Sequence, residues 1–170
     1  EFSLDKNVVL VGPNNSGKTT ILQALTLFHI GLKKIKEQSR KSSNRKKRTG
    51  IPINRQDLIA IPVSSSKSIW HNQYVRSINR ENNKQETKNV LIEIEAEGIN
   101  KDGRRWQAAL EFDYANSESF YVRPLRNEKG NKSQKQIDES AFEFDIAFLQ
   151  PMSGMSTEED KLTQGSIDVR

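Results

Sequence analysis

The order of apolar and polar positions near the start of the chain predicts a strand, a polar turn and a helix. Residues Val8 to Val11 form a continuous apolar run, which is typical of a strand buried on both faces in a parallel sheet. Apolar residues then recur at helical spacing from Thr19 to Leu32, on a stripe formed by Ile21, Leu25, Phe28 and Leu32. A buried strand followed by an amphipathic helix predicts the first unit of an α/β fold.

Alternating apolar and polar positions between residues 90 and 125 predict an antiparallel sheet. Three runs each place their apolar residues on one face: Val90, Ile92, Ile94 and Ala96; then Trp106, Ala108, Leu110, Phe112 and Tyr114; then Phe120 and Val122. Turn signals lie between them at residues 100–103 and 116–118. Because alternation implies one buried and one wet face, we expect the carboxylates here to be solubilising rather than catalytic. These are Glu93, Glu95, Glu111 and Asp113.

The segments on either side of this sheet give weaker signals. Residues 49–89 contain two Ile-Pro steps, which predict short strands or turns around one helical turn, and residues 79–89 predict a polar surface loop. Residues 141–149 alternate again and predict a strand ending at Gln150. We expect one partial domain with five parts: a strand, loop and helix (1–32), a basic loop (33–48), an irregular part (49–89), the antiparallel sheet (90–125), and a strand with a tail (141–170).

Composition narrows the class of protein. The chain has 170 residues, of which 34% are apolar, and this low apolar content favours long polar loops around one core. It contains no Cys, which excludes disulfides and cysteine-ligated metals. No stretch approaches the roughly 20 apolar residues of a membrane span, and the start lacks a signal-peptide pattern. We expect a soluble, cytoplasmic protein that does not contact a membrane.

The net charge of +5 is concentrated in one segment. Residues 33–48 hold nine Lys and Arg side chains against one acidic residue, Glu37. Such a like-charged polar block predicts a solvated, mobile loop. The same block is suited to neutralise the phosphates of double-stranded DNA or of RNA, with a steep dependence on salt, and it resembles a nuclear-localisation cluster.

Between the predicted strand and helix, residues 12–19 read Gly-Pro-Asn-Asn-Ser-Gly-Lys-Thr and fit the phosphate-binding loop (P-loop, or Walker A) pattern G-x-x-x-x-G-K-[ST]. Gly12 and Gly17 allow backbone angles that turn successive N–H groups inward to form an anion nest. Lys18 brings a charge to the β- and γ-phosphates, and the hydroxyl of Thr19 can ligate Mg²⁺. The following helix would aim its positive end at the phosphates. The sequence therefore predicts nucleotide binding.

The start of the chain also resembles a known family. Residues 2–20 read Phe-Ser-Leu-Asp-Lys-Asn-Val-Val-Leu-Val-Gly-Pro-Asn-Asn-Ser-Gly-Lys-Thr-Thr, and Ile-Leu-Gln-Ala-Leu follows at 21–25. This run is similar to the N-terminal lobe of ABC-type ATPases of the SMC, RecF, RecN and OLD kind, which act in chromosome maintenance, recombination repair and phage defence. The resemblance implies an α/β P-loop NTPase fold, the N-terminal lobe of an ABC ATPase head, with an added antiparallel β subdomain and then a Q-loop.

The resemblance also implies a site and its ligands, ATP and Mg²⁺. Thr19 and Gln150 would hold the metal, and Lys18 and Gln150 would be catalytic. The nucleotide would be bound by Gly12, Asn14, Asn15, Ser16, Gly17, Lys18, Thr19 and Thr20. Taken by itself, a glutamine at a strand end is usually no more than a polar residue.

The chain departs from the family in what it lacks. It has no Ser-Gly-Gly signature, no apolar strand ending in Asp-Glu and no switch histidine. We therefore expect a fragment: an ATP-binding half that hydrolyses ATP only with a C-terminal lobe or a second head in a homodimer, and that acts on DNA. Two alternatives stay open, a non-hydrolysing nucleic-acid-binding or scaffold module and a small P-loop kinase. A GTPase is disfavoured because no Asn-Lys-x-Asp motif follows the loop.

Overall fold

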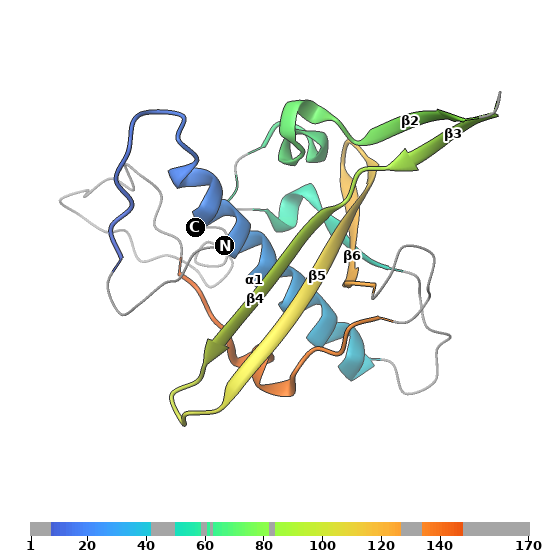
Figure 1. Cartoon of the computed structure of the whole chain (residues 1–170). Coiled ribbons are helices and arrows are strands. Elements are labelled where there is room, and N and C mark those ends of the chain that lie inside the picture. The colour runs from blue at the N-terminus through green and yellow to red at the C-terminus, as the bar shows by residue number, and fades with distance from the viewer. Residues whose placement is uncertain are drawn as a thin grey trace, which may run out of the picture.

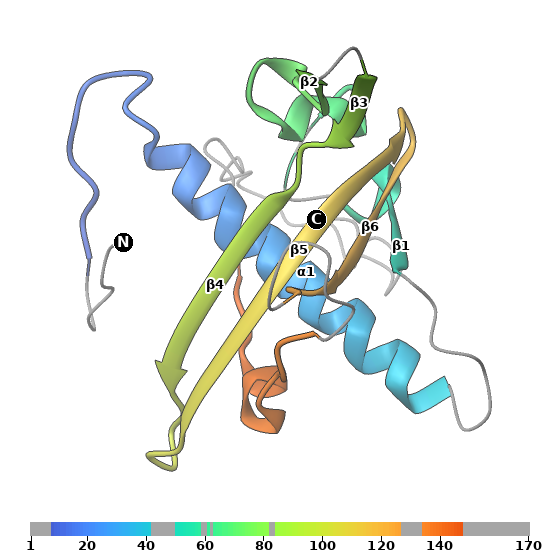
Figure 2. The same ribbon diagram turned by 45° about the vertical axis from the view of Figure 1, so that its right-hand side comes forward.

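The structure, a computed structural model, describes residues 8–41, 50–58, 61, 63–81, 84–126 and 134–147. One long helix, α1 (Lys18–Lys41), runs across one face of an antiparallel sheet (Figures 1 and 2). The strands are β1 (Ile51–Asn54), β2 (Arg76–Glu81), β3 (Lys84–Asn89), β4 (Ile92–Ile99), β5 (Arg105–Asn116) and β6 (Ser119–Pro124). The short 3₁₀ turns are η1 (Arg55–Asp57), η2 (Ser66–Ile69), η3 (His71–Gln73) and η4 (Glu139–Glu143).

The main sheet has the strand order β1-β6-β5-β4, and every neighbouring pair is antiparallel. The three strands predicted from alternation are therefore confirmed as β4, β5 and β6. Their register brings the predicted apolar faces together, since Ile94 lies opposite Leu110 and Phe112 lies opposite Val122. The turn between β4 and β5 closes at Gly103, which has a φ of 80° that favours glycine.

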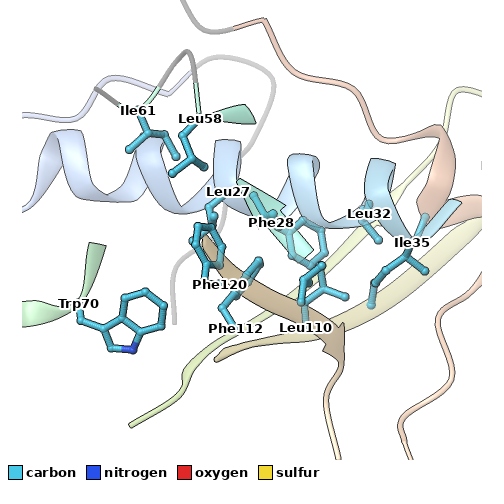
Figure 3. Close-up of a cluster of buried hydrophobic side chains, with 14 of the residues drawn as sticks. Leu27, Phe28, Leu32, Ile35, Leu58, Ile61, Trp70, Leu110, Phe112 and Phe120 are labelled. Carbon is cyan, nitrogen blue, oxygen red and sulfur yellow. The ribbon is translucent and has the colours of Figure 1, made fainter. Parts of the chain in front are cut away.

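The core lies between α1 and the sheet (Figure 3). Phe28 and Leu32 of α1 are fully buried against Leu110 and Phe112 of β5, as the helical stripe predicted. At Gly31 a Cβ would lie 2.8 Å from a methyl carbon of Leu110, so the helix backbone approaches the sheet closely. The buried stripe is made of Leu27, Phe28, Leu32 and Ile35. It begins later than predicted, because Ile21 and Leu25 are only half-buried. Within the described ranges, none of the helices combines the length and apolar character needed to cross a membrane.

The predicted parallel strand at Val8–Val11 is wrong in this structure. These residues belong to no strand, and the side chains of Val9 and Val11 are 84% and 88% exposed. A parallel strand is stable only between hydrogen-bonded neighbours that cover both of its faces. None of the strands in the described ranges pairs with residues 8–11. The apolar run therefore lies open to solvent.

The predicted loop at residues 33–48 is wrong over its first part, because α1 continues to Lys41. Ile35 is buried in the core, and two of the lysines reach across to other segments. The Nζ atom of Lys34 lies 2.9 Å from a carboxylate oxygen of Asp57, and that of Lys36 donates to the carbonyl of Phe142 at 2.9 Å. Lys, Glu and Gln are good helix formers, and these contacts hold the charged turns in place. Residues 42–48 lie outside the described residues.

The predicted surface loop at residues 79–89 is wrong as well, because β2 and β3 pair as a two-stranded hairpin with Arg76 opposite Asn89. Its sequence carries no alternation, and its one large apolar residue, Ile78, is 57% exposed. The short strand and helical turn predicted around Ile51 are confirmed as β1 and η1.

Residues 141–147 do not form the predicted strand. They make the end of η4 and then an extended stretch without ladder pairing. The alternation was nevertheless informative, because Phe142, Phe144 and Ile146 are half-buried whereas residues 143, 145 and 147 are exposed. The ring of Phe144 packs edge-on against Phe28 at 6.0 Å, so this segment covers α1 instead of joining a sheet edge. Phe148, Leu149 and Gln150 lie outside the described residues.

Glu111 is a further correction, because it is 1% exposed instead of lying on a wet face. Its carboxylate pairs with the guanidinium of Arg123 and lies 2.9 Å from that of Arg126. Arg123 also lies 3.1 Å from Asp113. These pairs satisfy the buried carboxylate, which would otherwise be costly to remove from water. The other two predicted surface carboxylates, at positions 93 and 95, are exposed.

Candidate functional site

In the loop that precedes α1, two residues have a left-handed backbone. Gly17 has a φ of 87°, and Asn15 beside it has a φ of 64°, which Asn tolerates better than most residues. At Gly12 a Cβ would lie 2.8 Å from the hydroxyl oxygen of Ser16, so a larger residue there would displace that side chain. The chain therefore turns tightly over the start of the helix.

The helix itself starts at Lys18, directly after this turn. The N–H of Ile21 donates to the carbonyl of Gly17 at 3.1 Å. The N–H groups of Lys18, Thr19 and Thr20 come before this bond, so they have no carbonyl four residues back within the helix. The first turn contains no acidic residue. A helix start of this kind can bind an anion through its free N–H groups and its dipole.

The side chain of Lys18 folds back over the loop. Its ammonium donates to the carbonyls of Gly12 and Pro13 at 2.8 and 2.6 Å, and it lies 3.3 Å from the hydroxyl of Ser16. All three of its hydrogens are thus directed at loop oxygens. The loop and the first turn of the helix are closed around one positive charge.

The residues of the predicted site are accessible to solvent. Gly17 and Lys18 are half-buried, and the others are exposed: Gly12, Asn14, Asn15, Ser16, Thr19 and Thr20. The structure brings the ammonium of Lys18 together with the carbonyl of Gly12 and the hydroxyl of Ser16. Gln150, the second predicted metal ligand, lies outside the described residues.

Comparison with known families agrees with this geometry. Residues 1–162 match the model of a family described as AAA domain. The chain belongs to this family. Its members form the N-terminal region of ABC-type, SMC-like P-loop ATPases, so the resemblance seen in the sequence is confirmed and ATP binding is implied. No curated protein and no solved structure matches the chain.

Two features of this AAA domain were not visible in its sequence. The left-handed backbone of Asn15 follows no fixed position of the P-loop pattern, although Asn is one of the few residues that adopt it. The bonds from Lys18 to loop carbonyls depend on a chain reversal that residue types alone do not specify.

Proposed function

We propose that this chain is the ATP-binding half of an SMC/RecF/OLD-like ATPase that acts on DNA and hydrolyses ATP only with a second lobe. The observation that carries the proposal is the closed loop at the start of α1, with the Lys18 ammonium held against the carbonyls of Gly12 and Pro13. A loop that gathers a cation and free N–H groups at one helix end is suited to a polyphosphate.

The roles of the individual residues follow from their positions. The backbone from Gly12 to Lys18, with Asn14, Asn15, Ser16 and Gly17 between, would surround the phosphates, and the N–H groups of Thr19 and Thr20 would extend this contact. Lys18 would exchange its carbonyl partners for phosphate oxygens. The exchange is favourable because a charged acceptor bonds an ammonium more strongly than a neutral carbonyl does.

Thr19 and Gln150 would hold Mg²⁺, which supplies charge neutralisation between the β- and γ-phosphates when it is bound. In hydrolysis, Lys18 and the loop N–H groups would stabilise the negative charge that develops as water attacks the γ-phosphate. Gln150 would orient that water or support the metal as a neutral ligand. These groups stabilise and position; none of them is a general base.

The second lobe is supported by the exposed apolar run before the loop. Val8, Val9 and Val11 are 42%, 84% and 88% exposed, and burying such side chains is worth roughly 1.5–3 kcal/mol each. A C-terminal lobe or a second head that pairs with residues 8–11 would complete a parallel sheet around the P-loop. It would also bring the signature and Asp-Glu motifs that this sequence lacks.

The first test is thermal denaturation with ATP and Mg²⁺. At tenfold excess over the dissociation constant, ATP should stabilise the chain by about 1.4 kcal/mol, or about 3–6 °C in melting temperature. Lys18→Ala should abolish this shift. Lys101→Ala is the matched control, since Lys101 is an exposed lysine in the β4–β5 turn, and it should keep the shift. No shift at millimolar ATP in the wild-type chain would refute nucleotide binding.

Contact with double-stranded DNA is proposed for residues 33–48. In the described part, Lys34 and Lys36 are used in internal contacts, which leaves Lys33 and Arg40 as exposed cations on α1. Lys33→Gln with Arg40→Gln should weaken duplex binding and reduce the salt slope by about 0.9 per lost phosphate contact. The control is Lys101→Gln with Arg105→Gln, which removes two exposed charges, one from the β4–β5 turn and one from the first residue of β5. Equal salt slopes for the two variants would exclude this contact.

A further inference from the structure

A second candidate site lies away from the P-loop, in a hollow of about 650 Å³ between η2–η3 and the β5–β6 turn. Hydrogen bonds join the two segments that form it. The N–H of Ser66, which is fully buried, donates to the carbonyl of Ser117 at 2.9 Å, and its hydroxyl donates to the carbonyl of Asn116. The buried ring of Trp70 stacks edge-on against Tyr114 at 5.8 Å. In Figure 1 this region is the green one beside the β2–β3 hairpin.

Both walls of the hollow carry unusual backbone. Asn72 and Gln73 are adjacent and both have positive φ, 50° and 57°, which Asn tolerates but which is costly for Gln. On the opposite wall β5 is bulged at Ala115, between Tyr114 and Asn116. Bulges and strained residues occur often where a chain presents side chains for binding.

The side chain presented here is Tyr74, which follows the strained pair directly and is 56% exposed. It lines this hollow and also a neighbouring one, whose other walls include His71 and Leu91. An exposed tyrosine between two hollows offers ring surface to a planar partner, whereas Trp70 nearby is buried and serves the core.

The charged residues that line the hollow with Tyr74 are both positive. Lys67 and Arg76 line the hollow, and no acidic residue does. Neither cation forms an ion pair with another residue in the described ranges. Elsewhere in those ranges many cations are paired, as Lys34 is with Asp57 and Arg55 is with Glu118. The hollow therefore joins an aromatic surface with two available positive charges.

We propose that this hollow binds single-stranded nucleic acid, with one unpaired base stacked on Tyr74 and the flanking phosphates held by Lys67 and Arg76. Aromatic rings and cations in alternation match the bases and phosphates of a single strand. In a duplex the bases are already stacked on one another, so the ring would stay unused. An acidic peptide would use the cations alone. The site shares no residue with the P-loop or with residues 33–48, so it stands apart from both contacts proposed above.

The test is fluorescence anisotropy of a labelled oligo-dT with the full chain. Tyr74→Ala should weaken binding roughly 5- to 150-fold, and Tyr74→Phe should retain it, since stacking needs the ring and not the hydroxyl. Tyr121→Ala removes another exposed tyrosine, on β6, and should leave affinity unchanged. Lys67→Gln with Arg76→Gln should reduce the salt slope by about 1.4, at about 0.7 per single-strand contact.

Three outcomes would overturn the site. If Tyr74→Ala bound the oligonucleotide as tightly as the wild type, no base would be stacked on this ring. If a duplex bound as tightly as the single strand and lost the same affinity in Tyr74→Ala, the site would have no preference for unpaired bases. Displacement of the oligonucleotide by an equal concentration of a poly-Glu peptide would indicate a general anion surface. Loss of oligonucleotide binding in Lys33→Gln with Arg40→Gln alone would support the duplex contact and count against this hollow.

Discussion

The two halves of α1 are held in place by different kinds of contact. At the N-terminal end, the bonds of Lys18 reach only to residues within six positions in the sequence, and the preceding Val9 and Val11 are exposed. From Leu27 onward the helix is packed on the sheet: Phe28 is fully buried, and the ammonium of Lys36 donates to a carbonyl 106 positions away. The P-loop is thus a local structure attached to a helix whose stability comes from the sheet.

This difference has a functional consequence. Because the core does not depend on the loop, the loop can change its contacts when a phosphate or a second lobe arrives without disturbing the packing of the sheet. If the two regions are independent, a substitution in the core should change the free energy of unfolding and a substitution beside the loop should not.

The largest effect is expected in the core. Phe28→Ala should lower the free energy of unfolding by about 3–5 kcal/mol, because it removes a fully buried ring packed against Phe112 and Phe144. Val11→Ala is the matched control and should change stability by no more than about 0.5 kcal/mol, since its side chain is 88% exposed. Urea denaturation followed by circular dichroism measures both. Comparable losses in the two variants would mean that residues 8–11 are packed in the native state.

The second prediction concerns the contribution of the buried Glu111 ion pairs to the free energy of unfolding. Glu111→Gln removes the charge that pairs with Arg123 and Arg126 and should cost about 2–3 kcal/mol. Glu95→Gln is the control, because Glu95 is exposed and its pair with Lys135 is worth about 0.5 kcal/mol or less. If both variants unfold at the same urea concentration as the wild type, the Glu111 cluster is a surface network and not a buried one.

The parts of this fold that could be predicted are those whose signal is local. The strands β4 to β6 follow from alternation within each strand, and their turns follow from residues such as Gly103. The P-loop could be predicted from residue types at fixed spacing, because each fixed residue supplies either a backbone conformation or a charge. Phe28 and Leu32 were placed correctly because the helical period continues across them.

The parts that could not be predicted depend on partners far away in the sequence. Val8–Val11 has the composition of a buried strand. A strand forms only when it pairs with another strand, and the apolar run by itself does not identify that partner. Residues 141–147 have the right alternation, yet they pack on α1 rather than on a sheet edge. Glu111 occupies a polar position in the pattern and is buried only because Arg123 and Arg126 cover it.

The smallest predicted effect concerns His29, a half-buried residue that follows the buried Phe28 on α1. Burial lowers the pKa of His29 below its ordinary 6.5, although Asp145, 3.2 Å away, acts to raise it and Lys33 acts to lower it further. The folded state therefore binds this proton less readily than the unfolded state does. It follows that stability is fully present above pH 6.5 and is lost as the pH falls toward the lowered pKa.

His29→Gln should flatten this dependence between about pH 7.5 and about pH 5, because it removes the group that titrates there. His71→Gln is the control, since His71 is exposed in η3, and it should keep the wild-type pH dependence. Urea midpoints measured across the range compare the three proteins. If His29→Gln loses stability with falling pH as the wild type does, then the contact between α1 and Asp145 does not exclude water, and residues 144–147 cover the helix only loosely.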